Sequence, residues 1–174
     1  MGSTFTLWLP IRSEESVSTE PALSLPGSTP ALPPTPVAPS QEPAPLDTRR
    51  LVGKKILIVE DDARNLYAVT SLLEDKGVQV LPTSSAVEAF SILRAHPDVD
   101  LVLMDIMMPD IDGYQATRQI RGMKEFSTLP ILAFTAKASG TDRAQALAAG
   151  CNEVLVKPAE NRKLFAELLR HLRS

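Results

Sequence analysis

With 174 residues, a formal net charge of −3 and a single cysteine, the chain is long enough for one domain of ordinary size and a tail. Its basic residues form no cluster longer than a pair such as Arg49–Arg50, which argues against the basic face that nucleic-acid binding requires. One cysteine excludes an internal disulfide and fits a reducing compartment, and no apolar run approaches the length of a membrane span. These features predict a cytoplasmic chain with no nucleic-acid partner and no membrane contact.

Composition divides the chain into two parts. Ten of its fifteen prolines lie before residue 46, and residues 21–45 are almost wholly Pro, Ala, Ser, Thr, Leu and Glu. Such a segment cannot bury enough apolar surface to offset its ordering entropy, and its prolines favour extended conformers. We therefore predict a disordered Pro-rich linker over 12–52 and a folded domain over 53–174. The alternative is that residues 33–36 form a Pro-rich ligand for a partner's groove.

From residue 53 onward, short apolar runs alternate with helical periodicity. Strands are predicted at 55–59, 78–81, 100–104, 130–134 and 152–156. Helices are predicted at 63–76, across 86–93 and 114–120, at 140–149 and at about 160–172. Five strand–helix units with short connections predict an α/β fold with a doubly wound, five-stranded parallel sheet covered by helices on both faces.

Polar residues follow four of the predicted strands at the point where each one ends. Glu60 and Asp61 come after the first strand, and Asp105 comes after the third. Thr135 ends the fourth strand and Lys157 follows the fifth. Because the carboxyl ends of parallel strands share one edge of the sheet, we expect these side chains to converge there.

The expected cluster suits phosphoryl transfer. Three neighbouring carboxylates repel one another, and a hard divalent cation such as Mg²⁺ relieves that repulsion. Asp105 would attack the phosphorus in line, while the Thr135 hydroxyl and the Lys157 ammonium stabilise the phosphoryl oxygens. The product, an acyl phosphate, is hydrolysable and therefore suits a reversible switch.

These residues stand in motifs of a known family. The motifs lie at 56–61, 105–113, 134–136 and 156–158. Glu60 and Asp61 precede Asp105 by 45 and 44 residues, and the threonine and lysine follow it by 30 and 52. With these motifs in order and register, residues 54–172 resemble the receiver domain of two-component response regulators. The resemblance implies the flavodoxin-like (βα)5 receiver fold.

The resemblance also assigns roles and partners. It implies that Asp105 takes a phosphoryl group from a phosphohistidine of a histidine kinase or a histidine phosphotransfer domain. It further implies that Asp61 and Asp105 bind Mg²⁺ with the backbone carbonyl of Met107, while Glu60 acts through a metal-bound water. One position departs from the family pattern, since receivers commonly carry Tyr or Phe three residues before the lysine, where this chain has Val154. We expect phosphorylation to survive this difference, whereas readout through an aromatic rotamer is in doubt.

A second, shorter resemblance lies at the start of the chain. Residues 2–10 resemble the last strand of the ATP-binding domain of sensor histidine kinases. A kinase strand over 1–11, a Pro-rich linker and a receiver would be the layout of a hybrid histidine kinase, of which this chain would be a C-terminal piece. The sequence carries neither the Asn- and Gly-rich ATP boxes nor a phosphoacceptor-histidine helix, so kinase activity is not expected of this stretch itself.

Two other functions fit the sequence less well. The first is a stand-alone single-domain response regulator with an N-terminal extension. The second is a Mg²⁺-dependent phosphatase of the aspartyl-nucleophile type, which usually carries its nucleophile in an Asp-x-Asp motif after the first strand. Here the best nucleophile, Asp105, follows the third strand instead. Asp62, the third acid after the first strand, is expected to cap the following helix, with metal ligation as the alternative.

Overall fold

The computed structural model describes residues 46–109, 111–136 and 139–172. The predicted kinase strand at 1–11 and most of the predicted linker lie outside these residues. The strands are β1 (Lys55–Val59), β2 (Gln79–Thr83), β3 (Leu101–Asp105), β4 (Ile131–Thr135) and β5 (Glu153–Val156). The α-helices are α1 (Ala63–Glu74), α2 (Ala86–Ala95), α3 (Gly113–Gly122), α4 (Gly140–Ala149) and α5 (Asn161–His171). Two short 3₁₀-helices, η1 (Thr48–Leu51) and η2 (Lys124–Phe126), complete the described fold.

All neighbouring strands of the sheet are parallel, and their order is β2-β1-β3-β4-β5. The order reverses between β1 and β3, which is the place where open α/β sheets bind their ligands. The strand ends are also in register, because Val59 pairs with Met104 and Thr135 pairs with Val156. The structure thus confirms the predicted doubly wound, flavodoxin-like fold.

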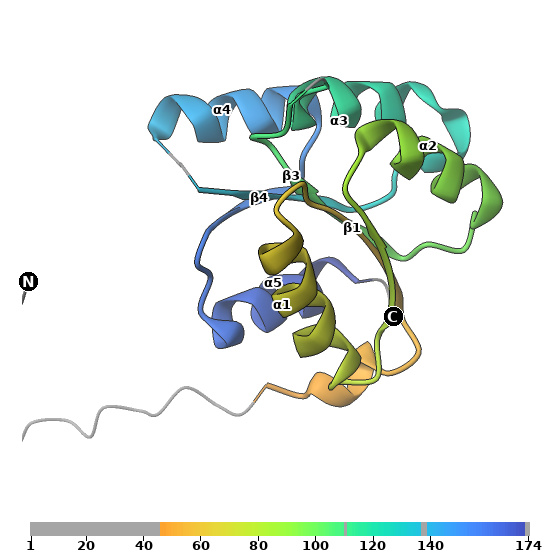
Figure 1. Cartoon of the computed structure of the whole chain (residues 1–174), viewed down its shortest axis with the longest axis vertical. Coiled ribbons are helices and arrows are strands. Elements are labelled where there is room, and N and C mark those ends of the chain that lie inside the picture. Colours follow the sequence, from red (N-terminus) through yellow and green to blue (C-terminus); the bar gives the residue numbers. More distant parts are fainter. Residues whose placement is uncertain (1–45, 110, 137–138, 173–174) are drawn as a thin grey trace, which may run out of the picture. The chain divides into compact units, whose positions relative to one another are not determined.

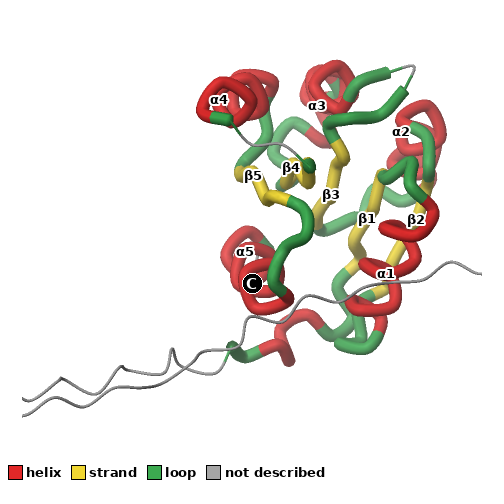
Figure 2. The backbone as a smooth tube through the Cα atoms, turned by 60° about the vertical axis from the view of Figure 1, so that its left-hand side comes forward, coloured by secondary structure: helices red, strands yellow, loops and turns green. Residues whose placement is uncertain are grey.

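Helices cover both faces of this sheet. One face packs under α2, α3 and α4, and the other packs under α1, α5 and η1 (Figures 1 and 2). The central strands β3 and β4 are buried at every position, as expected of parallel strands with helices on both sides. None of the helices in the described ranges is long and apolar enough to cross a membrane.

Side chains that cap the helices set where they begin. Asp62, Ser85 and Asp112 each accept a backbone N–H bond at the start of α1, α2 and α3, and for Asp62 this is the role that the sequence predicts. Gly150, with a φ of 109°, ends α4 as predicted. The first helix is shorter than predicted and ends at Glu74, because the following turn tightens to three-residue hydrogen bonds before a left-handed glycine.

The packed region also begins before residue 53. Leu51 of η1 is fully buried, and Leu46 packs against the same apolar cluster as α1 and α5. The short helix η1 is capped by Asp47, whose side chain accepts the Arg49 N–H. The last residues of the predicted linker therefore belong to the folded core.

Candidate functional site

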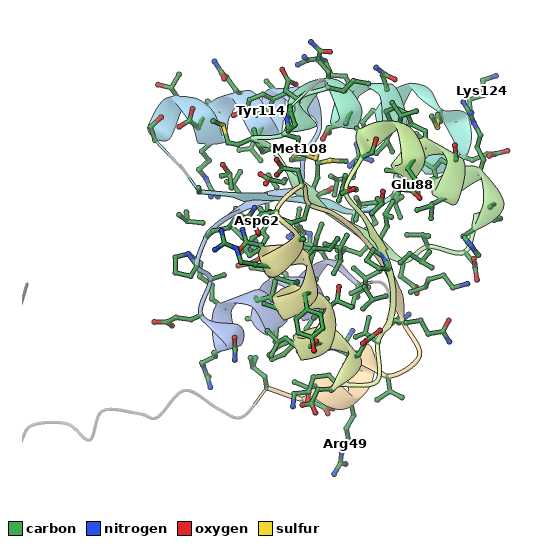
Figure 3. The ribbon with its side chains drawn as sticks, viewed as in Figure 1. Arg49, Asp62, Glu88, Met108, Tyr114 and Lys124 are labelled. Atoms are coloured by element: carbon green, nitrogen blue, oxygen red, sulfur yellow. The ribbon has the colours of Figure 1, made fainter. Side chains whose placement is uncertain are left out.

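Three carboxylates meet at the carboxyl edge of the sheet. One carboxylate oxygen from each of Glu60, Asp61 and Asp105 lies within 4.8 Å of the others. We call these residues the acidic triad. Figure 3 shows the surroundings, with Asp62 at the start of α1 and Met108 in the loop that follows β3. The expected convergence of residues from two separate strand ends is therefore observed.

The members of the acidic triad differ in burial. Glu60 is 2% exposed and Asp105 is 4% exposed, whereas Asp61 is exposed to solvent. Burial raises the pKa of the Glu60 carboxyl, and the hydrogen bond from Lys157 partly offsets that rise. Two buried carboxylates side by side are unfavourable unless a cation accompanies them.

Lys157 supplies one such cation. Its ammonium lies 2.7 Å from Asp105 Oδ2 and also forms an ion pair with Glu60 Oε2. The same ammonium lies 5.2 Å from the centroid of the Phe134 ring, within the range of a cation–π contact. Because this side chain is only 12% exposed, its attraction to both carboxylates is poorly screened by solvent.

The second oxygen of Asp105 is held by the loop after β3. The Met107 N–H donates to Asp105 Oδ1 at 2.9 Å, while the Met107 side chain is 58% exposed. This loop returns to Gly113, whose N–H donates to the Ile106 carbonyl at 3.1 Å. A Cβ at residue 113 would lie 2.2 Å from the Asp105 carbonyl oxygen, so the close approach of α3 to β3 requires glycine.

Thr135 ends β4 beside this group and is 3% exposed. Its carbonyl accepts the Lys157 N–H at 2.8 Å, which fixes the start of the β5–α5 loop against the end of β4. The structure therefore brings together Glu60, Asp61, Asp105, Thr135 and Lys157 at one edge. Their catalytic and metal-binding roles, and that of the Met107 carbonyl, remain predictions.

Asp62 does not join the acidic triad. Its side chain accepts the N–H of Arg64 at 2.8 Å and that of Asn65 at 3.4 Å, which makes it the cap of α1. These hydrogen bonds lower the pKa of the Asp62 carboxyl. The capping role expected from the sequence is thus the one that the geometry supports.

Sequence reasoning did not single out Asn65, which also contacts the triad. Its Nδ2 donates to Glu60 Oε1 at 3.3 Å from the first turn of α1. The sequence did contain a signal, because a polar residue in the first helical turn after a strand-end acid can reach back toward that acid. Its direction, however, depends on how Asp62 begins the helix.

Val154 is buried in the apolar cluster on the α2–α4 face of the sheet. An aromatic side chain does contact α4, but it comes from α3. Tyr114 packs against the same cluster, and its hydroxyl donates to the Asp142 carbonyl of α4 at 3.3 Å. That Val154 weakens readout through an aromatic rotamer remains a prediction.

A groove adjoins the acidic triad between α1 and the start of α5. It has a volume of about 550 Å³. Asn65, Val69 and Leu72 line it from α1, while Pro158, Ala159, Asn161 and Leu164 line it from the other side. Lys157 and Phe134 also contribute to its wall, so the groove leads to the site.

A second cluster has similar spacing but different charge compensation. Glu153, Glu167 and His171 also bring one ligand atom each within 4.8 Å, and we call them the Glu–His cluster. Arg143 lies 2.6 Å from Glu153, and Arg170 forms longer ion pairs with both glutamates. Two guanidinium groups therefore already balance the two carboxylates.

The acidic triad fits Mg²⁺ by the chemistry of its donors. It offers only carboxylate oxygens, the ligands that hard cations prefer, and two strand ends hold them in place. In the described part of the chain, one ammonium pairs with two of the three carboxylates, so this group retains an excess of negative charge. Both features favour a divalent cation at this edge.

Similarity to known proteins identifies the family. The model of the response regulator receiver domain matches residues 56–169. The chain belongs to the response regulator receiver domain family. Sensor histidine kinase GacS of Pseudomonas protegens is 34% identical over 129 residues, which cover 72% of this chain and 14% of the kinase. Protein PilH of Pseudomonas aeruginosa is 36% identical over 111 residues, which cover 64% of this chain and 91% of PilH.

Solved receiver structures agree with this assignment. The receiver domain of sensor histidine kinase PA1611 from Pseudomonas aeruginosa is 35% identical, with a TM-score of 0.62. The match covers 69% of this chain and 98% of that receiver, whose structure holds a magnesium ion coordinated in the active-site cleft. The receiver fold and the place of the chain in two-component signalling are thereby confirmed. Because the chain spans only a small part of GacS, the activity of a whole kinase does not transfer to it.

Proposed function

We propose that this receiver accepts a phosphoryl group on Asp105 with the help of Mg²⁺. The observation that carries the proposal is the surplus of carboxylates at the edge of the sheet, where the buried Asp105 shares the Lys157 ammonium with Glu60. A buried carboxylate in this position gains no obvious packing advantage over an apolar residue. Its chemistry accounts for its presence.

The residues divide the reaction among them. A carboxylate oxygen of Asp105 forms a bond to phosphorus as the phosphorus–nitrogen bond of a phosphohistidine breaks. The imidazole nitrogen leaves with the bonding electron pair and is then protonated from solvent. The Lys157 ammonium and the Thr135 hydroxyl stabilise the phosphoryl oxygens through charge and hydrogen bonding.

Glu60, Asp61 and Asp105, with the Met107 carbonyl, are the groups that would hold Mg²⁺. A cation held there would supply positive charge that offsets both the carboxylates and the phosphoryl oxygens. Asp105 is held ready by the Met107 N–H and by Lys157, so little rearrangement of the protein is required before attack. A relative solved with magnesium in its active-site cleft supports this role.

We further propose that the phosphoryl donor is a histidine kinase or a histidine phosphotransfer domain, and that the module acts in the cytoplasm. In the preferred arrangement, residues 1–11 end a kinase ATP-binding domain, 12–45 form the linker, and the receiver of a hybrid kinase includes the packed residues from 46 onward. The similarity to GacS and to the PA1611 receiver supports this arrangement. Protein PilH, of which 91% is covered, supports a stand-alone regulator as the second candidate.

Phosphorylation of the full chain tests the central proposal. Incubation with acetyl phosphate and Mg²⁺ should add one phosphoryl group, seen by intact mass spectrometry. Asp105→Asn and removal of Mg²⁺ with EDTA should each abolish the added mass. The matched control Glu153→Gln removes a carboxylate from the Glu–His cluster and should leave labelling intact. Labelling that persists in Asp105→Asn, or without Mg²⁺, would refute the mechanism.

The gene sequence upstream of Met1 distinguishes the two arrangements. An ATP-binding domain encoded in frame before residue 1 supports the hybrid kinase and excludes the stand-alone regulator. An in-frame stop codon there, with a start codon at Met1, supports the stand-alone regulator and excludes the hybrid kinase.

A further inference from the structure

Both carboxylate oxygens of Glu60 have partners from opposite sides. Oε2 forms an ion pair with Lys157, which also binds Asp105. Oε1 accepts a hydrogen bond from Asn65 Nδ2 at 3.3 Å. The two contacts together fix the plane of a carboxylate that is 2% exposed. Without the second contact, the attraction of Lys157 would act alone on the Glu60 side chain.

The start of α1 places Asn65 for this contact. Asp62 caps the helix and accepts the N–H groups of Arg64 and Asn65, so the first turn has a defined position. Since Asp62 performs the capping, the Asn65 amide is not needed for it and reaches back to Glu60 instead. Asp61 lies between the strand and the cap and remains exposed. Residues 60–65 thus leave Asp61 exposed to solvent and hold the buried Glu60 carboxylate in place through Asn65.

We propose that Asn65 is a positioning residue of this receiver, which orients the Glu60 carboxylate for the divalent cation and so supports phosphoryl transfer. The inference rests on the proposed Mg²⁺ site. Asn65 acts through Glu60 and needs no contact with the phosphoryl group. Partners that orient metal ligands typically change metal affinity by about 10- to 100-fold when they are removed. We expect the lower end, because Asn65 lies at the solvent-facing end of the contact.

Mg²⁺ affinity of the full chain, measured by titration calorimetry, provides the first test. Asn65→Ala should weaken Mg²⁺ binding by about tenfold. Asn65→Leu, which keeps the branching of the side chain at Cγ but cannot donate a hydrogen bond, should weaken it equally. The matched control is Asn161→Ala, because this asparagine begins α5 and lines the same groove. Its Mg²⁺ affinity should stay within about twofold of the wild type, a difference too small to indicate a lost supporting contact.

A double-mutant cycle then tests whether Asn65 acts through Glu60. Glu60→Asp keeps the charge but shortens the side chain, which moves the carboxylate away from Asn65. In the Glu60→Asp background, Asn65→Ala should change Mg²⁺ affinity by less than about twofold. Thermal unfolding without Mg²⁺ shows that each variant is folded at the temperature of the titration.

Two results would overturn the inference. One is an unchanged Mg²⁺ affinity in both Asn65 variants. The other is a tenfold loss of affinity that is the same in the wild-type and the Glu60→Asp backgrounds, which indicates an effect independent of Glu60. These failures differ from a failure of the proposed function, in which the wild-type chain itself would bind no Mg²⁺ and accept no phosphoryl group.

Discussion

The acidic triad and the Glu–His cluster have nearly the same ligand spacing, yet they differ in charge compensation. Each brings three potential ligand atoms within 4.8 Å of one another. Among the described residues, Lys157 pairs with two of the three carboxylates of the triad, whereas Arg143 and Arg170 pair with the two glutamates of the other cluster. The comparison teaches that the spacing of carboxylates does not by itself define a cation site. The charge that remains after pairing does.

The largest contrast is expected in phosphorylation rate. Lys157→Ala should slow phosphorylation by acetyl phosphate by about 100- to 1,000-fold, because it removes a preorganised cation from the phosphoryl oxygens. Arg143→Ala removes a cation from the Glu–His cluster and should change the rate by no more than about twofold, since it touches no reacting group. Initial rates from intact mass spectrometry measure both. Equal losses in the two variants would remove the functional distinction between the clusters.

Val154→Ala extends this test to the readout position. It should impair phosphorylation far less than Lys157→Ala, because Val154 lies in the apolar cluster and carries no charge toward the site. A loss of phosphorylation as large as that of the lysine variant would contradict the expectation that phosphorylation does not depend on the residue at position 154.

Mg²⁺ binding should separate the clusters next. Asp61→Asn removes a proposed ligand and should weaken binding by about 100-fold, the upper end of the range known for partners of metal sites. Glu167→Gln should leave the affinity unchanged, because its cluster is already balanced by arginines. Calorimetric titration of both variants provides the comparison. Weakened binding in Glu167→Gln would place a second cation in the Glu–His cluster.

Stability without Mg²⁺ should change in opposite directions. Glu153→Gln should lower the free energy of unfolding by about 1 kcal/mol, because it leaves Arg143 without its charged partner. Asp61→Asn should raise it slightly, since one of three repelling carboxylates loses its charge. Urea unfolding in EDTA measures both changes. A loss of stability in Asp61→Asn would mean that the triad is balanced without a cation.

The smallest effect is expected in pH dependence. Burial raises the pKa of Glu60, so its ionisation destabilises the fold as pH rises above the ordinary value of 4.5. Although burial acts on Glu153 as well, the Val154 N–H and Arg143 lower its pKa, so its stabilisation is lost as pH falls below 4.5. In EDTA, the stability difference between Glu60→Gln and wild type should therefore shrink on acidification from neutral pH. The stability difference between Glu153→Gln and wild type should persist to lower pH than the difference for Glu60→Gln. If the Glu153→Gln difference disappeared at the higher pH of the two, these pKa directions would be contradicted.

The triad could be predicted from the sequence because the order and direction of the strands are enough to bring its residues together. Parallel strands deliver their carboxyl ends to one edge, so Glu60, Asp105 and Lys157 converge whatever the details of packing. The cap at Asp62 was also predictable, because its hydrogen bonds are local. Contacts whose direction depends on tertiary packing were not. The position of Asn65 in the first turn of α1 does not show that its amide turns toward Glu60, and no sequence spacing reveals the pairing of Arg143 with Glu153.

Element boundaries were less predictable for a related reason. Helix-compatible residues continue through Lys76, but the tight turn before the left-handed Gly77 ends α1 two residues earlier than predicted. At the start of the domain, the proline-rich composition obscured Leu46 and Leu51. Their burial depends on a surface that α1 and α5 create only after folding.

The burial of Leu51 in η1 determines where the chain is tethered. The segment enters the domain just before β1, at the edge of the sheet opposite the acidic triad. Removing this apolar side chain from the core would forfeit about 2 kcal/mol. A receiver produced from residue 53 onward would therefore lack part of the apolar core, whereas one that begins before Leu46 would retain it. The buried residue Leu51 and the edge that carries Asp105 therefore lie at opposite ends of β1, so the packing of η1 does not occupy the edge where we propose that phosphorylation takes place.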